Sequence, residues 1–194
     1  LGPQVEPKHV YSDNAREFDR ALTDMGISKD TCTPHRPQTN GIAERGVRSI
    51  TEQVRTMLID LESKLNCKIK ATHPIMYWLV EHAAFIISYF QTGSDGKTPY
   101  ERHKGKPAKL ELCAFGEQVF YMPLKGHEEG GKRRPRYLEG TWLGVNEINK
   151  EVYIGTPNGV KRARSIMRKP DAEKWNREAV MMIKGTPWSC LLYT

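Results

Sequence analysis

The sequence lacks a pair of cysteines at the spacing that a zinc site requires. Its four cysteines, Cys32, Cys67, Cys113 and Cys190, are far apart along the chain. Structural zinc sites use closely spaced ligand pairs, so a zinc knuckle is excluded. Scattered thiols fit a reducing compartment, where buried or idle cysteines need no partner.

Long hydrophobic runs are also missing. The most apolar stretch, IMYWLVEHAAFIISYF at 75–90, carries Glu81 and His82 at its centre. A membrane-spanning helix needs about 20 consecutive apolar residues, so we expect a buried helix here and no membrane partner. The N-terminal LGPQVEPKHV contains no secretory signal, and a chain that starts with Leu1 is expected to be a piece of something longer.

Acidic residues are too few to balance the basic ones. The chain holds 30 Lys and Arg against 23 Asp and Glu, a net charge of +7. Residues 125–169 contain eleven Lys and Arg but only five Asp and Glu, which is almost the whole excess. This balance favours a polyanion as partner over an acidic protein or a neutral metabolite.

Hydrophobic spacing and turn residues divide the chain into two parts with different sequence patterns. In the first part, the pattern predicts strands at 8–12 and 27–33 and helices at 16–25, at 42–65 and from Pro74 to near Gly93. In the second part, short apolar runs at 118–122, 141–145, 151–154 and 160–166 are typical of a small antiparallel barrel of four or five strands. Asn158-Gly159 predicts a hairpin between the last two runs. A short helix near 171–182 and a tail complete the chain.

Two carboxylates are candidates for a metal site. Asp13 follows the first predicted strand, and Glu44 lies in the first turn of the long predicted helix, just after a loop rich in proline. Mg²⁺ prefers such oxygen ligands, and a pair of ions about 4 Å apart can promote phosphoryl transfer. Alternatively, Asp13 is a turn residue and Glu44 stabilises the helix N-terminus electrostatically. Spacing alone favours this second interpretation.

Basic residues share the helix face of Glu44. At about 100° per residue, Glu44, Arg48, Thr51 and Arg55 form one stripe beside the apolar face. That apolar face consists of Val47, Ile50, Val54, Leu58, Leu61 and Leu65. Arginines next to a metal-binding carboxylate suit a phosphate backbone, although an ordinary solvated helix face shows the same pattern.

The segments SDNAREF at 12–18 and TPHRPQTNGIAERGVR at 33–48 resemble the second half of the integrase core of retroviruses and long-terminal-repeat retrotransposons. The pattern P-x-x-P-Q-x-N-G-x-x-E-R is complete from Pro34 to Arg45. Downstream, KTPYERHKGKP, CAFGEQVFYMP and YLEGTWLGVNEINKEVYIGTPNGVKRARSIMR are similar to the region after the core in copia-type elements. The resemblance covers about residues 8–169.

This resemblance implies an α/β fold in which a partial RNase H-like integrase core, a sheet edge plus helices, occupies 1–103. An SH3-like antiparallel β-barrel follows at 104–169, and a short helix and tail at 170–194. It also implies two Mg²⁺ or Mn²⁺ ions and the joining of retroelement DNA to target DNA. Asp13 and Glu44 match the second and third acids of the catalytic triad, Gln38 and Asn40 match the loop beside the active site, and Arg48 matches a position that faces DNA.

Three features depart from the family pattern. The first acid of the triad is expected several dozen residues before Asp13, but only 12 residues precede it, and Glu6 is not assigned that role. The 30 residues from Asn14 to Ala43 are fewer than the family commonly has between its second and third acids. Ala15-Arg16 replaces a common Gly-Gly. We therefore expect an incomplete two-ion site and no DNA integration by this chain alone.

The second part of the chain offers further nucleic-acid contacts. Arg133, Arg134 and Arg136 lie in one predicted loop, and Arg162 and Arg164 share one face of a predicted strand. With Gln38, Asn40, Arg48 and Arg55, they are the residues predicted to bind nucleic acid. The aromatic residues between them, Tyr137, Trp142 and Tyr153, are expected in the core rather than stacked on bases.

Three functional interpretations stay open. The chain is part of an integrase-class polynucleotidyl transferase, a non-catalytic nucleic-acid-binding remnant of a retrotransposon polyprotein, or a protein-interaction module with incidental charge. An upstream strand with an aspartate would favour the first over the second, and salt-dependent DNA binding would separate both from the third. By analogy with integrases, self-association in the parent protein and a nuclear, otherwise cytoplasmic, location are expected.

Overall fold

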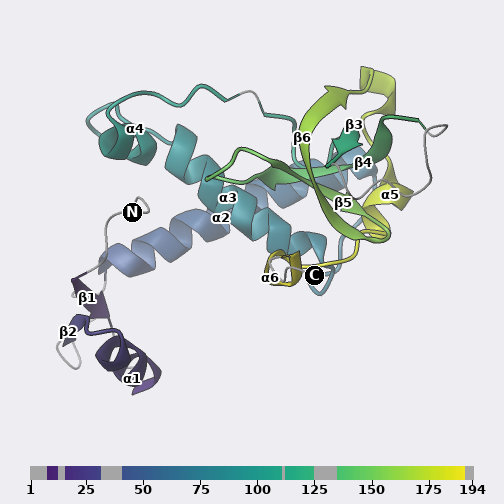
Figure 1. Cartoon of the computed structure of the whole chain (residues 1–194). Helices are drawn as coiled ribbons and strands as arrows, with labels where there is room; N and C mark the ends of the chain where they lie inside the picture. The colour runs from purple at the N-terminus through teal and green to yellow at the C-terminus, as the bar shows by residue number, and fades with distance from the viewer. Residues whose placement is uncertain (1–7, 13–15, 32–40, 111, 125–134, 191–194) are drawn as a thin grey trace.

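A computed structural model of the chain describes residues 8–12, 16–31, 41–110, 112–124 and 135–190 (Figure 1). Its elements are β1 (His9–Ser12), α1 (Arg16–Asp24), β2 (Ser28–Thr31), α2 (Gly41–Leu65), α3 (Ile75–Phe90), α4 (Pro99–Lys104), β3 (Gln118–Pro123), β4 (Leu138–Val145), β5 (Val152–Thr156), β6 (Gly159–Arg168), the 3₁₀ helix η2 (Asp171–Glu173), α5 (Arg177–Met181) and α6 (Pro187–Cys190). No helix in these ranges is long and apolar enough to cross a bilayer.

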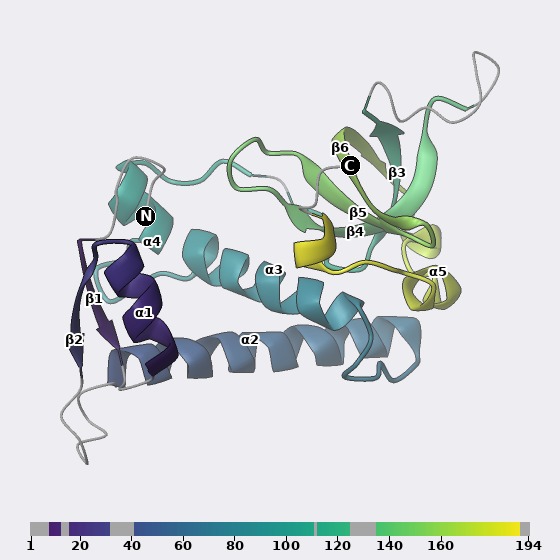
Figure 2. The same cartoon turned by 60° about the horizontal axis from the view of Figure 1, so that its bottom comes forward.

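The first three elements form a small parallel unit. Strands β1 and β2 pair from His9 with Ser28 to Ser12 with Thr31, and α1 connects them. The predicted strands and helix in this region are therefore confirmed. Figures 1 and 2 place this unit at the N-terminal end of α2, away from the β-barrel. The described sheet has two strands here, and the RNase H-like architecture stays a prediction.

Helices α2 and α3 pack against each other, and α3 runs back along α2 (Figure 2). The apolar stripe of α2 is buried only toward its C-terminus. Leu61 is 1% exposed, whereas Val47, near the start of the helix, is 66% exposed. The long helix predicted from the apolar spacing is therefore confirmed, but its N-terminal half lies outside the core.

Strands β3, β4, β5 and β6 close an antiparallel barrel, which confirms the predicted small barrel. Thr156 pairs with Gly159 across a turn made by Pro157 and Asn158, as the hairpin signal predicts. Proline fixes the first turn position, and Gly159 takes a φ of 102°, which side chains with a Cβ rarely adopt. The assignment of this barrel as SH3-like stays a prediction.

One hydrophobic cluster joins the helices to the barrel. It contains Leu61 and Leu65 of α2, Ile75, Trp78 and Leu79 of α3, Leu143 and Tyr153 of the barrel, and Val180 and Ile183 after it. Trp78 also donates a hydrogen bond of 2.9 Å from Nε1 to the carbonyl oxygen of Gly185. Side chains thus pack across the predicted boundaries near residues 103 and 169, which themselves stay predictions.

A second cluster fills the barrel and includes Val119, Tyr121, Trp142, Ile154 and Ala163. Trp142 and Tyr153 are buried, at 1% and 7% exposure, so the expectation that they belong to the core is confirmed. Tyr137 is half-buried just before β4.

The barrel seam carries an ion pair between buried Glu117 and half-exposed Arg168. Glu117 is fully buried, and its carboxylate accepts hydrogen bonds from Nε and Nη2 of Arg168, at 2.8 and 2.7 Å, and from the backbone N–H of Ala114. Burial raises the pKa of Glu117, but these hydrogen bonds outweigh that effect and hold the pKa below its ordinary value. The pair fixes the segment before β3 against the end of β6.

Two local structures differ from the expectations. The predicted helix near 171–182 is divided into η2 and α5, because Asn176 is extended and its side chain caps α5 by accepting a bond from the N–H of Ala179. Helix α4 was not expected. It begins with a capping box, in which Thr98 and Glu101 each bond the other's backbone N–H.

His82 generates a prediction about stability and pH. Burial lowers its pKa to about 4, so the folded state keeps the ring neutral, whereas the unfolded chain takes up a proton near 6.5. Above pH 6.5, His82 is neutral in both states and does not lower the free energy of unfolding. As the pH falls from 6.5 toward 4, protonation of the unfolded chain progressively lowers that free energy. We expect the free energy of unfolding to fall by about 2 kcal/mol between pH 7 and pH 5, measured by urea titration.

The variants His82→Leu and His103→Gln make a matched comparison, since His103 is exposed. His82→Leu should lose most of the pH dependence, and His103→Gln should keep it. Equal pH dependence in the wild type and His82→Leu would contradict the assignment.

Candidate nucleic-acid interface

Several of the predicted site residues lie outside the described residues. These are Asp13, Gln38, Asn40, Arg133 and Arg134. Strand β1 ends at Ser12, so Asp13 directly follows a strand, as the sequence indicates. The convergence of Asp13 with Glu44 stays a prediction.

Glu44 lies exposed in the first turn of α2. Within the described residues it forms no ion pair, even with Arg48 one turn further along. Its carboxylate oxygens are therefore available for a metal ion or a hydrogen-bond donor. The described ranges contain no cluster of three or more His, Cys, Asp or Glu that could hold a metal ion. Glu44 can supply one ligand, and these ranges do not complete a site around it.

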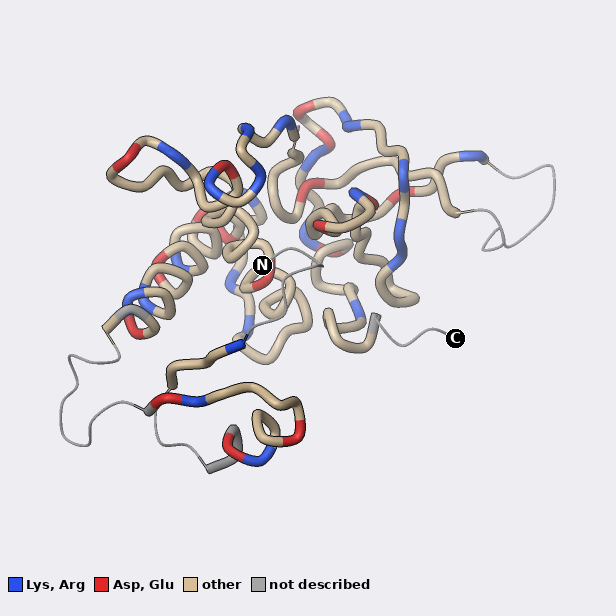
Figure 3. The backbone as a smooth tube through the Cα atoms, turned by 60° about the vertical axis from the view of Figure 1, so that its left-hand side comes forward, with Lys and Arg blue, Asp and Glu red and all other residues tan. Residues whose placement is uncertain are grey.

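The rest of the predicted stripe also lies on the surface. Arg48 and Arg55 are exposed and have no ion pair with another described residue, whereas the hydroxyl of Thr51 is committed to the carbonyl oxygen of Val47 at 2.8 Å. Charges of both signs occur along α2 (Figure 3). The helix thus presents arginine donors beside Glu44 without forming a purely basic surface.

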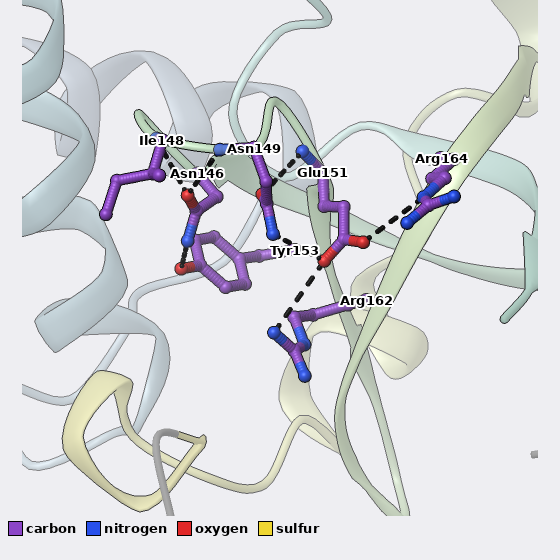
Figure 4. A network of polar contacts seen from close by, with 7 residues as sticks. All are labelled: Asn146, Ile148, Asn149, Glu151, Tyr153, Arg162 and Arg164. Carbon is purple, nitrogen blue, oxygen red and sulfur yellow. Dashed lines mark hydrogen bonds and ion pairs between the residues drawn. The ribbon is translucent and has the colours of Figure 1, made fainter.

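The barrel arginines share a buried counter-charge. Nε of Arg164 lies 3.3 Å from one carboxylate oxygen of Glu151, and Nη1 of Arg162 lies 3.7 Å from the other (Figure 4). The Glu151 side chain is 6% exposed, while Arg162 and Arg164 are 34% and 78% exposed. The two arginines therefore project from β6 toward solvent with one carboxylate behind them.

The β4–β5 loop holds that carboxylate in place. Asn149 donates from Nδ2 to Glu151 at 2.9 Å and accepts from the Glu151 backbone N–H. Asn146 accepts from the N–H groups of Ile148 and Asn149 and donates to the hydroxyl of Tyr153 (Figure 4). A preorganised carboxylate reduces the number of positions that each guanidinium samples, which favours a defined binding surface.

Sequence reasoning missed the role of Glu151. The strand register contains the signal for this contact. Val152 pairs with Ala163, so the next pair in the same antiparallel register is Glu151 with Arg164. Opposite charges at such positions stabilise a strand pair. Counting back from the Pro157-Asn158 turn would have found this contact.

The remaining basic residues differ in whether they are paired with an acid within the fold. Arg136 is exposed before β4 and has no ion pair with another described residue. Lys169, by contrast, is buried and lies 2.9 Å from Glu139, and Arg168 binds Glu117. The excess positive charge of this region is therefore partly neutralised within the fold.

Two known proteins are similar to the chain in sequence, and both are retrovirus-related Pol polyproteins of transposons. The polyprotein of transposon TNT 1-94 from Nicotiana tabacum is 43% identical over 56 residues, 26% of this chain and 4% of its own length. That of transposon RE2 from Arabidopsis thaliana is 32% identical over 114 residues, 55% of this chain and 7% of its own length.

The chain is therefore related to retrotransposon Pol polyproteins, as the sequence resemblance predicts. It spans 4% and 7% of the length of these two relatives. No protein-family model matches the chain.

Two solved structures align with parts of the chain. The catalytic core domain of BIV integrase has 24% identity and a TM-score of 0.35, with 50% of this chain and 59% of that chain covered. A chain of the simian T-cell lymphotropic virus intasome in complex with the PP2A regulatory subunit B56 gamma has 16% identity and a TM-score of 0.38, with 85% and 59% covered. Both scores are too low to establish a shared fold.

Replacing Glu151 by glutamine tests whether its charge organises β6. We expect Glu151→Gln to lower the free energy of unfolding by about 1–2 kcal/mol, because hydrogen bonds to charged groups are lost while the side-chain shape is kept. A lower urea midpoint at an unchanged m-value would report this loss. Glu147→Gln, an exposed change in the same loop, is the control. If both variants unfold at the same urea concentration, the carboxylate does not organise the strand.

Proposed function

We propose that this chain is part of the integrase of a retrotransposon polyprotein and holds DNA for strand joining. The carrying observation is an exposed face of α2, on which Glu44, Arg48 and Arg55 lie in line and form no ion pairs within the described residues. This face begins inside the P-x-x-P-Q-x-N-G-x-x-E-R pattern. The sequence relationship to two Pol polyproteins supports the same role.

In this proposal, Asp13 and Glu44 hold Mg²⁺ or Mn²⁺ in the complete protein. Such ions would activate the attacking hydroxyl and stabilise the leaving oxygen of a phosphodiester. Arg48 and Arg55, one and three turns after Glu44, would position the DNA backbone by binding phosphate oxygens. Gln38 and Asn40 would contact DNA from the loop that precedes α2.

The barrel would supply a second contact with the DNA backbone. Arg162 and Arg164, oriented by Glu151, would bind phosphates together with Arg136 and the preceding Arg133 and Arg134. Self-association, a nuclear location and target DNA as partner follow from the integrase role as parts of this proposal.

A second candidate function is DNA binding without catalysis. It requires only the arginines of α2 and of the barrel, Arg48, Arg55, Arg162 and Arg164, and no metal site. The two candidates share the DNA-binding surface and differ only in the metal chemistry.

DNA binding by the arginines of α2 should depend on salt. We expect the chain to bind duplex DNA at low salt, with log K falling linearly as log salt rises. Because each phosphate contact contributes about 0.9 to that slope, Arg48→Ala with Arg55→Ala should reduce the slope by roughly 2. Fluorescence anisotropy at several salt concentrations measures both quantities.

The matched control replaces Lys70 and Arg177, which are exposed basic residues away from the proposed face, by alanine. This double variant should retain the wild-type slope. An equal loss in both double variants would indicate non-specific attraction, and binding that ignores salt would rule out the proposed contacts.

The shared metal site can be tested with Mn²⁺, which broadens the NMR signals of nearby nuclei. If Asp13 and Glu44 share an ion, amide signals next to both residues should broaden at the same Mn²⁺ concentration. Glu44→Gln should abolish the broadening at both places, since one remaining carboxylate binds such ions weakly. Glu52→Gln, on the same helix, should leave it unchanged. Independent broadening at the two acids would contradict a shared ion.

A further inference from the structure

A pocket of about 240 Å³ lies between α3 and the β4–β5 loop. Helix α3 contributes Trp78, Glu81, His82 and Phe85 to its lining, and residues 143–148 with Tyr153 form the opposite side. The DNA-binding proposal uses none of the α3 residues. The pocket therefore needs a separate explanation.

A β-bulge shapes one wall of this pocket. The register of β4 against β5 shifts between Trp142 and Gly144, and Gly144 has a φ of 150°. A Cβ built at Gly144 would lie 3.7 Å from Nδ1 of His82, so this nitrogen faces the bulged wall. Bulges often occur beside functional sites because they redirect the backbone locally.

Among the described residues, Nδ1 of His82 has no hydrogen-bond partner, although His82 is only 4% exposed. The ring stacks on Phe115 at a centroid distance of 5.5 Å and packs at nearly a right angle to the ring of Trp142 at 5.0 Å. A buried polar atom without a partner destabilises a fold by about 1–3 kcal/mol. Such an atom facing a pocket can accept a hydrogen bond from a molecule bound there.

Two carboxylates line the same pocket. Glu81 and Glu147 are both exposed, and neither forms an ion pair within the described part of the chain. Partial burial, and then the negative charge of Glu147, raise the pKa of Glu81. A positive group between the two carboxylates would remove their repulsion.

We propose that this pocket binds an organic cation with N–H donors, such as the guanidinium or ammonium group of an arginine or lysine side chain. One N–H would donate to Nδ1 of His82, and the positive charge would lie near Glu81 and Glu147. The apolar stem of such a side chain fits against the rings of Trp78 and Phe85. Anions are excluded by the two carboxylates.

Nα-acetylarginine methylamide is the probe, and its citrulline counterpart, which has the same shape without the charge, is the control. Titration calorimetry with the full chain should show saturable binding of the arginine probe and binding at least roughly tenfold weaker for citrulline, which corresponds to about 1.4 kcal/mol. The ¹⁵N signal of His82 Nδ1 should shift as the arginine probe saturates the pocket.

Glu81→Gln and Glu147→Gln should each weaken binding of the arginine probe roughly two- to fivefold, because each removes one partly solvated charge pair. Glu173→Gln, an exposed acid on η2, should leave the affinity unchanged. These substitutions lie on the surface, so folding should be retained. His82→Leu should lower the affinity as well.

Agmatine, a free amine with the same guanidinium group, distinguishes the two sources of such a cation. Tighter binding of the capped amino acid identifies a polypeptide side chain as the ligand, and tighter binding of agmatine identifies a free metabolite. Both results support the binding of an organic cation in this pocket. Equal binding of arginine and citrulline, or saturation without a shift at Nδ1, would overturn the proposal.

Discussion

Burial of α3 between α2 and the barrel is the constraint on which the rest of the structure depends. Trp78 and Leu79 are almost fully buried among side chains of α2, the barrel and the segment after it. This packing fixes only the C-terminal half of α2 to the core. The N-terminal half of α2 consequently extends beyond the barrel (Figure 2), and its residues Glu44 and Arg48 are exposed. The position of the proposed DNA-binding face follows from which half of the helix is buried.

Buried acids determine how much of the positive charge is available to bind partners outside the fold. Glu117 binds Arg168, and Glu151 lies between Arg162 and Arg164, so single carboxylates orient arginines that the net charge alone would count as free. Such pairing fixes the direction of a guanidinium and leaves some of its N–H donors for other partners. The barrel is therefore better described as a few oriented arginines than as a diffuse basic surface.

Local signals predicted most of the fold. Apolar spacing located α2 and α3, and turn residues located the β5–β6 hairpin, because these features depend on neighbouring residues. Burial along a helix depends on distant packing, so the spacing could not show that Val47 is exposed while Leu61 is buried. The missed helix α4 was encoded by Thr98 and Glu101.

The candidate site was predicted less completely. The sequence identified the arginines of α2 and β6, but it missed Glu151, the counter-charge of the two β6 arginines. The position of His82 beside a bulged strand could not be predicted, since it requires α3 and β4 to be docked. The pairing of Asp13 with Glu44 stays a prediction. Hydrogen–deuterium exchange with and without duplex DNA tests the account most directly. Slower exchange on DNA binding at 42–55 and 160–166 is predicted, and unchanged exchange in both segments would contradict it.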